Sequence, residues 1–191
     1  MIDYSALDRT WRDIITTIPM VDNMPEFLIL KYIVLHPEVW PRYREYPLIF
    51  AWELPLDPQR TDAGKVDLVL TDGQGKFLLV EVKYISPKPG KTARTKRNKN
   101  RKKGAEQASS FKTQFQQLHP EWHVDAETVT NDQIWSEAYE QFVTAEWTRI
   151  ETELQAPVPS EYSQNTPLID VVNAGMRRRQ KHYKAPPESN E

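Results

Sequence analysis

The chain has 191 residues, 39% hydrophobic and 27% charged, which is enough for one domain with a sizeable core and a strongly polar surface. It has no cysteine, which excludes disulfides, thiolate zinc sites, iron–sulfur clusters and cysteine catalysis. No apolar run is long enough to cross a membrane, and the N-terminus does not resemble a secretory signal. We therefore expect a cytoplasmic protein with no membrane partner.

The net charge of −2 conceals a strong segregation of charge along the chain. Residues 121–161 are rich in acids, whereas the run 86–103 has nine basic residues and no acid. A second basic cluster lies at 177–179. This sorting matters more than the net value, because a block of like charge is typical of an interaction segment. The nine cations of the run are Lys88, Lys91, Arg94, Lys96, Arg97, Lys99, Arg101, Lys102 and Lys103.

Two helices are predicted at the start of the chain. Apolar residues recur at three- and four-residue steps over 3–18, which is typical of an amphipathic helix. Asp22 and Asn23 then offer an N-cap before a helix over 25–36. That second helix is apolar on nearly every side, so we expect it to be deeply buried.

Three strands are predicted next, over 48–56, 65–70 and 76–85. The last two are joined by the Asp-Gly turn 71–75, which is typical of a hairpin. Their apolar runs are nearly continuous, so both faces of the sheet should be covered. The pattern therefore favours an α/β fold with a central mixed sheet flanked by helices.

The second half of the chain is predicted to be mainly helical, apart from the basic run 86–103. That run has almost no apolar residue, so we expect a mobile loop that is disordered without a partner. The predicted helix over 131–155 has aromatic residues at helical spacing, which are typical of a core or of an interface, such as that of a homodimer. The predicted elements are a helix from about Gly104 to Pro120, a short strand at 122–124, helices over 131–155 and 168–181, and a disordered tail, 185–191.

Three charged residues interrupt the apolar strands. Asp67 lies in one hairpin strand, and Glu81 and Lys83 lie in the other, two positions apart and therefore on one face. Buried charges are costly unless they are paired or bind a metal. A partly buried ion pair, such as Glu81 with Lys65 or Lys83 with Asp67, is the purely structural interpretation.

The spacing of these residues resembles the PD-(D/E)xK nuclease superfamily. Asp67 is followed by a Gly-containing turn and then by Glu81-Val82-Lys83 in a hydrophobic strand, although Val66 replaces the proline of the signature. The resemblance covers about residues 22–125. It implies a restriction-endonuclease-like core with extra N- and C-terminal helices, in one domain over 1–184.

The resemblance also implies a metal-dependent endonuclease that hydrolyses phosphodiester bonds. Mg²⁺, with Mn²⁺ as a substitute, prefers oxygen ligands. Asp67, Glu81 and the Val82 carbonyl would supply them, while Lys83 would orient or activate water or stabilise the oxyanion.

Two further positions are implied by the resemblance. Glu26, on the buried helix before the sheet, would bind the metal directly or through water, with Glu53 in the first strand as a competing candidate. Gln107, on the helix after the sheet, would be a further site residue. The carboxylates of Glu26, Asp67 and Glu81 are then expected to converge around an ion-sized gap near Lys83.

The basic run would complement such a site by following a phosphate backbone, which gives salt-sensitive affinity for nucleic acid, with DNA favoured over RNA. Two other functions remain open at this point. One is an inactive nuclease-fold module for nucleic-acid binding or assembly. The other is an interaction protein in which the basic run and the acidic helix bind each other or a partner.

Overall fold

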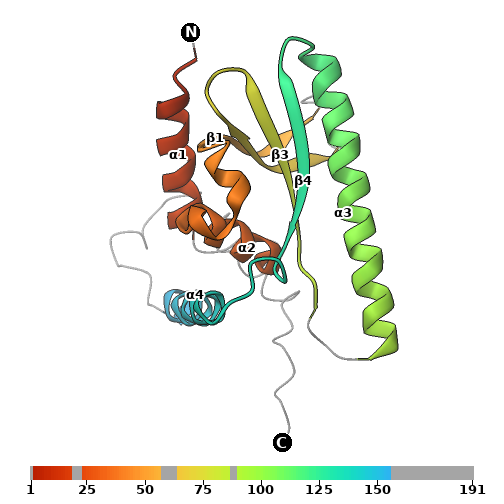
Figure 1. The fold of residues 1–191 in the computed structure, drawn as a ribbon. Helices are drawn as coiled ribbons and strands as arrows, with labels where there is room; N and C mark the ends of the chain where they lie inside the picture. The colour runs from red at the N-terminus through yellow and green to blue at the C-terminus, as the bar shows by residue number, and fades with distance from the viewer. Residues whose placement is uncertain (1, 19–22, 57–63, 87–89, 156–191) are drawn as a thin grey trace, which may run out of the picture. The chain divides into compact units, whose positions relative to one another are not determined.

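A four-stranded mixed β-sheet organises the protein in a computed structural model, which describes residues 2–18, 23–56, 64–86 and 90–155 (Figure 1). Its strands, in spatial order, are β1 (Leu48–Pro55), β2 (Lys65–Thr71), β3 (Lys76–Lys83) and β4 (His123–Thr130). The first three strands pair antiparallel, and β4 pairs parallel to β3. The predicted α/β fold with a mixed sheet is confirmed.

Helices flank this sheet. α1 (Tyr4–Thr17) packs on β1 and α2 (Met24–Leu35) on β3, while α3 (Lys91–Leu118) packs along β3 and β4 (Figure 1). Nine of the twelve residues of α2 are buried, as its apolar sequence predicts. The last helix is α4 (Glu137–Gln155). None of the helices in the described ranges combines the length and the apolar character needed to cross a membrane.

The chain divides into two units, residues 1–146 and 147–191. The first contains the whole sheet and the first three helices. Of the second, only the last part of α4, up to Gln155, belongs to the described residues. The predicted extent of a single domain over 1–184 therefore stays a prediction, and the helix over 168–181, the cluster 177–179 and the tail 185–191 lie outside the described residues.

The hairpin between β2 and β3 is confirmed. The carboxylate of Asp72 accepts the N–H groups of Gln74 at 2.7 Å and Lys76 at 3.0 Å. Gly73 and Gly75 have φ angles of 76° and 102°, which only glycine adopts without strain. The turn chemistry thus fixes the register that places Asp67 near Glu81.

The expectation of a mobile loop over 86–103 is wrong for most of the run, because residues 91–103 form the first half of α3. Residues 87–89, including Lys88, lie outside the described residues. Lys, Arg and Ala are good helix formers, and the first turns of α3 extend beyond the ends of β3 and β4 (Figure 1). Because those turns have no sheet to pack against, they need no apolar face, and the sequence shows no helical periodicity there.

The region around residue 131 also differs from the prediction. Instead of starting a helix, it follows a strand that runs from His123 to Thr130, and α4 begins only at Glu137. The Asn131 side chain is buried, accepts the N–H of Ile85 at 2.6 Å and donates to the Ile85 carbonyl at 3.1 Å. Asn131 therefore joins the end of β3 to the turn after β4 and does not cap a helix.

Candidate active site

The charged residues of the hairpin strands meet at one end of the sheet, on the face that α3 covers. Val69 pairs with Leu79 and Leu68 with Val80, and the β2–β3 ladder ends there. One further step would place Asp67 opposite Glu81. Instead, the strands separate, and Asp67 Oδ2 accepts the backbone N–H of Val82 at 2.7 Å. The fold thus brings Asp67 beside Glu81, as the sequence predicts.

Lys83 is the positive centre of this cluster. Its Nζ lies 2.6 Å from Glu81 Oε1 and 3.7 Å from Glu26 Oε2. The side chains of Glu81 and Lys83 are only 3% and 15% exposed. The ion pair between Glu81 and Lys65, which a purely structural role predicts, is not formed, because Lys65 pairs with Glu53. The shorter of the two Lys83 ion pairs is formed within the Glu-x-Lys motif itself.

Glu26 reaches the cluster from the first turn of α2. Its Oε1 accepts the N–H of Tyr84, just past the end of β3, at 3.2 Å. Its Oε2 accepts a hydrogen bond from the side-chain amide of Asn23, the residue before the helix. Both carboxylate oxygens are thus engaged, and they hold α2 against the end of β3.

Glu53, the competing candidate, lies beside Asp67 in the β1–β2 register, because its neighbours Trp52 and Leu54 pair with Leu68 and Val66, but its ion pair is formed outside the cluster. Its carboxylate is half exposed and pairs with Lys65 at 3.2 Å. Its backbone has a φ of 48°, unusual for a residue with a side chain. The structure therefore brings Glu26, and not Glu53, to Lys83.

The electrostatics of the cluster are those of a buried carboxylate pair with one amine. Burial and the charge of Glu81 raise the pKa of Asp67 to about 7, against the opposing effect of the Val82 N–H and Lys83. Burial also raises the pKa of Glu81, although Lys83 opposes this. Burial is the largest single influence on the pKa of Lys83 and lowers it, but the hydrogen bond to Glu81 and the charges of Glu81, Glu26 and Asp67 together raise the pKa. Asp67 is therefore poised to change protonation near neutral pH.

Helix α3 lies over the cluster, and Gly104 is in close contact with it. A Cβ on Gly104 would lie 2.7 Å from Thr128 Cγ2 and 3.1 Å from Lys83 Cγ. Thr128 of β4 is the ladder partner of Glu81, so both side chains face α3. Thr128 and the role of Gly104 could not be predicted from the sequence, because neither belongs to a local motif. The β3–β4 pairing places Thr128 here, and the packing of α3 on the sheet places Gly104.

Gln107 lies one turn after Gly104 on the same face of α3, as a predicted site residue should. Three buried oxygens in this region accept no hydrogen bond within the described residues: Glu81 Oε2, Gln107 Oε1 and Thr128 Oγ1. An unsatisfied buried polar atom costs about 1–3 kcal/mol, and a charged one more. Such atoms are informative because they indicate a polar partner outside the protein chain.

The convergence of three carboxylates on an ion-sized gap is not observed. In the described part of the chain, no group of three or more His, Asp or Glu side chains is arranged to hold a metal ion. The physical reason is that Lys83 supplies the positive charge on which Glu81 and Glu26 converge.

The donor set nevertheless fits Mg²⁺, which is usually bound by one or two carboxylates together with water and substrate phosphate. Asp67 and the unpartnered Glu81 Oε2 supply oxygen donors of that kind. Val82 contributes its N–H to Asp67, and its carbonyl stays a predicted ligand.

The basic half of α3 extends away from the cluster. Arg101 pairs with Asp132, and Lys102 pairs with Glu106. The charge of Lys103 opposes the rise in the pKa of Glu81 that burial causes. Four exposed cations have no acidic partner among the described residues, and we call them the outer basic set: Lys91, Arg94, Lys96 and Lys99. The N-terminal half of α3 therefore carries exposed positive charge on several sides of the helix.

Comparison of the chain with protein-family models, with curated proteins and with solved structures finds no match.

Proposed function

We propose that the protein is a metal-dependent nuclease that hydrolyses phosphodiester bonds, with DNA as the favoured substrate. The observation that carries the proposal is the cluster of Asp67, Glu81 and Lys83, buried under α3, in which Glu81 Oε2 has no hydrogen-bond partner among the described residues. Where buried charges serve stability alone, their oxygens are in the large majority of cases hydrogen-bonded within the protein or to ordered water.

The order of elements supports the proposal. Two helices, three antiparallel strands, a crossover helix and a parallel strand follow each other, and the charged residues lie on the second and third strands. The PD-(D/E)xK superfamily, which the motif resembles, has this arrangement of strands and charged residues. The expected cytoplasmic location belongs to the same proposal.

In the proposed reaction each residue has a separate task. Asp67 and Glu81 present carboxylate oxygens that would hold Mg²⁺, which when bound polarises the phosphoryl group and neutralises charge. The Lys83 amine donates hydrogen bonds that orient the attacking water and stabilise negative charge on the phosphoryl oxygens. Glu26 is a positioning residue, because it contacts the Lys83 amine and the backbone just past β3.

The test is cleavage of single-stranded, double-stranded and branched DNA and of RNA, each with Mg²⁺, Mn²⁺ or EDTA. We expect metal-dependent cleavage that Glu81→Gln and Lys83→Met each lower at least about 100-fold. Lys65→Met is the matched control, since Lys65 is an exposed lysine on the neighbouring strand that pairs with Glu53. Cleavage that survives both site substitutions would refute the proposal.

A binding module without activity is the second candidate. Two observations favour it: no three-ligand group is found among the described residues, and the Lys83 amine pairs with two of the three acids. The same assay separates the two functions. Salt-sensitive DNA binding without cleavage in any metal would identify the binding module.

A further inference from the structure

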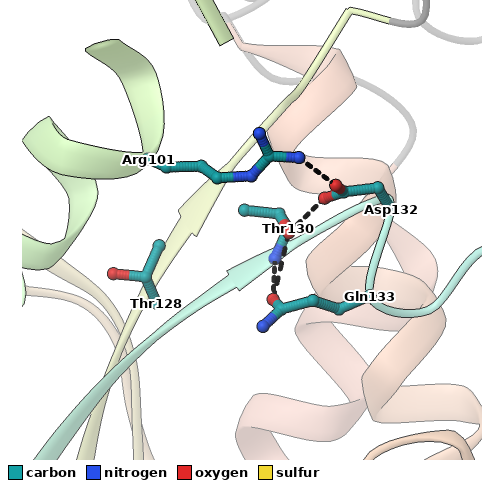
Figure 2. A pocket seen from close by; sticks show the side chains of 5 residues that line it. All are labelled: Arg101, Thr128, Thr130, Asp132 and Gln133. Carbon is teal, nitrogen blue, oxygen red and sulfur yellow. Dashed lines mark hydrogen bonds and ion pairs between the residues drawn. The ribbon is translucent and has the colours of Figure 1, made fainter. Parts of the chain in front are cut away.

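Two adjoining cavities lie beside the candidate active site, between α3 and the end of β4. One, of about 220 Å³, is lined by Arg101, Thr128, Thr130, Asp132 and Gln133 (Figure 2). The other, of about 250 Å³, shares Arg101 and Asp132 with the first, and Ile85, Ser86, Arg97 and Trp135 also line it. None of these residues was assigned a role in the proposed hydrolysis.

The first cavity adjoins the catalytic cluster directly. In the parallel ladder Thr128 pairs with Glu81, and Thr130 pairs with Lys83. Since paired residues of neighbouring strands point to the same face, the cavity begins one strand away from the carboxylate and the amine. A molecule in the cavity would therefore be a neighbour of the phosphodiester held at the cluster.

The polar wall of the cavity is held in place by its own hydrogen bonds. Figure 2 shows Asp132 between Arg101 and the Thr130 hydroxyl, while Gln133 Oε1 accepts the Thr130 N–H at 2.7 Å. Burial alone would raise the pKa of Asp132, but the hydrogen bonds from Thr130 and Arg101 lower it, so the carboxylate is ionised at neutral pH. The buried Asn131, anchored to Ile85, fixes the turn that carries these residues.

The second cavity has an exposed aromatic wall. Trp135 is 48% exposed, which makes it one of only four large hydrophobic side chains exposed in the described part of the chain. Its ring packs edge-on against Tyr139 at 5.8 Å between centroids, so its orientation is supported from one side. Arg97 and Arg101 of the basic helix line the same cavity.

We propose that these cavities bind an unpaired nucleobase beside the cleaved phosphodiester, so that the substrate is single-stranded or locally unpaired nucleic acid. The inference deepens the proposed nuclease function and depends on it for the identity of the neighbouring phosphate. Trp135 provides the stacking face, and Arg101, Asp132 and Gln133 provide hydrogen-bonding groups for a base edge.

The chemistry of the walls favours a base over other ligands. A phosphate group would meet the ionised Asp132, which already neutralises Arg101. A base edge, in contrast, presents donors and acceptors together and has a π-face that stacks on tryptophan. A protein partner is less well matched, because the exposed ring is flanked by the cations of α3, which favour a polyanion.

The test is binding of fluorescein-labelled oligothymidine and of a duplex of equal length, measured by anisotropy in EDTA. We expect Trp135→Ala to weaken single-strand binding about 5- to 150-fold, the range for loss of one stacked base, with little change for the duplex. Trp135→Phe should retain most of the affinity. Leu118→Ala, at the other exposed end of α3, is the matched control and should change neither.

The outcomes separate this inference from the nuclease proposal. If Trp135→Ala weakens single-strand and duplex binding equally, the base-binding site is overturned. If its affinity for DNA is unchanged but its sedimentation is altered, the site is also overturned, and Trp135 belongs to a protein interface. Asp132→Asn should change the ratio of affinities for homopolymers of different bases. Selective loss of single-strand binding in a protein that never cleaves would retain the base site and remove the nuclease.

Discussion

Asp67→Asn should stabilise the protein at neutral pH, even though Asp67 is central to the proposed chemistry. The pKa of Asp67 is raised from its ordinary value of 3.8 to about 7 by burial and by Glu81. Each tenfold change in proton affinity corresponds to about 1.4 kcal/mol, so keeping Asp67 ionised in the folded protein costs about 4 kcal/mol above pH 7. Asparagine removes that charge and keeps an oxygen for the Val82 N–H.

The pH dependence follows from which state binds the proton more tightly. Between about pH 4 and pH 7 the folded protein retains a proton that the unfolded chain has lost, so wild-type stability falls as pH rises. The advantage of Asp67→Asn should therefore be small near pH 4, grow by about 1.4 kcal/mol per pH unit, and become constant above about pH 7.

Urea unfolding in EDTA, followed by circular dichroism across this pH range, measures the difference. Glu53→Gln is the control, because it removes an exposed carboxylate from the adjacent strand and should change stability by less than about 1 kcal/mol throughout. A stability difference for Asp67→Asn that does not vary with pH, or a loss of stability near pH 8, would show that Asp67 is not held beside Glu81 as described.

Three further predictions concern α3 and the core. Gly104→Ala should lower the free energy of unfolding by up to about 2 kcal/mol, because overpacking against Thr128 outweighs the helix propensity of alanine. The same variant should cleave more slowly, because the added methyl group displaces Lys83. A stabilised, fully active variant would contradict this. Lys31→Met should destabilise the protein by about 3 kcal/mol in urea unfolding, because Glu146 loses a buried partner at 2.7 Å, and adding Glu146→Gln should recover part of the loss. Replacing the four residues of the outer basic set with glutamine should reduce the slope of log affinity against log salt by up to about 3.6 for duplex DNA, and an unchanged slope would place the phosphate contacts elsewhere.

The cluster explains why the site residues reduce stability. Two buried carboxylates beside a single amine leave Asp67 destabilised when ionised, and in the described part of the chain Glu81 Oε2 finds no hydrogen-bond partner. Such local conflicts are expected at functional sites, where the partner of the charged groups comes from outside the chain.

The sequence alone determined the features that depend only on residues close together in the chain, namely the hairpin turn, the faces of the strands and the burial of α2. The Asp-Gly turn sets the hairpin, the period of two places Glu81 and Lys83 on one face, and the continuous apolar residues of α2 require burial. The nuclease-like spacing of Asp67, Glu81 and Lys83 could be recognised for the same reason: turn geometry and strand periodicity are local.

Only the tertiary structure decided the rest, because it depends on contacts between distant segments. Nothing local shows that the basic run is helical, since its first turns extend past the sheet and bury no apolar face. The choice of Glu26 over Glu53 required the docking of α2 on β3, and Thr128 joined the site only through the parallel β3–β4 ladder. Glu26 and Glu81 both contact the Lys83 amine and leave no gap for an ion between them. Side chains form ion pairs with the charges that are nearest in space, and the order of residues in the sequence does not show which charges these are.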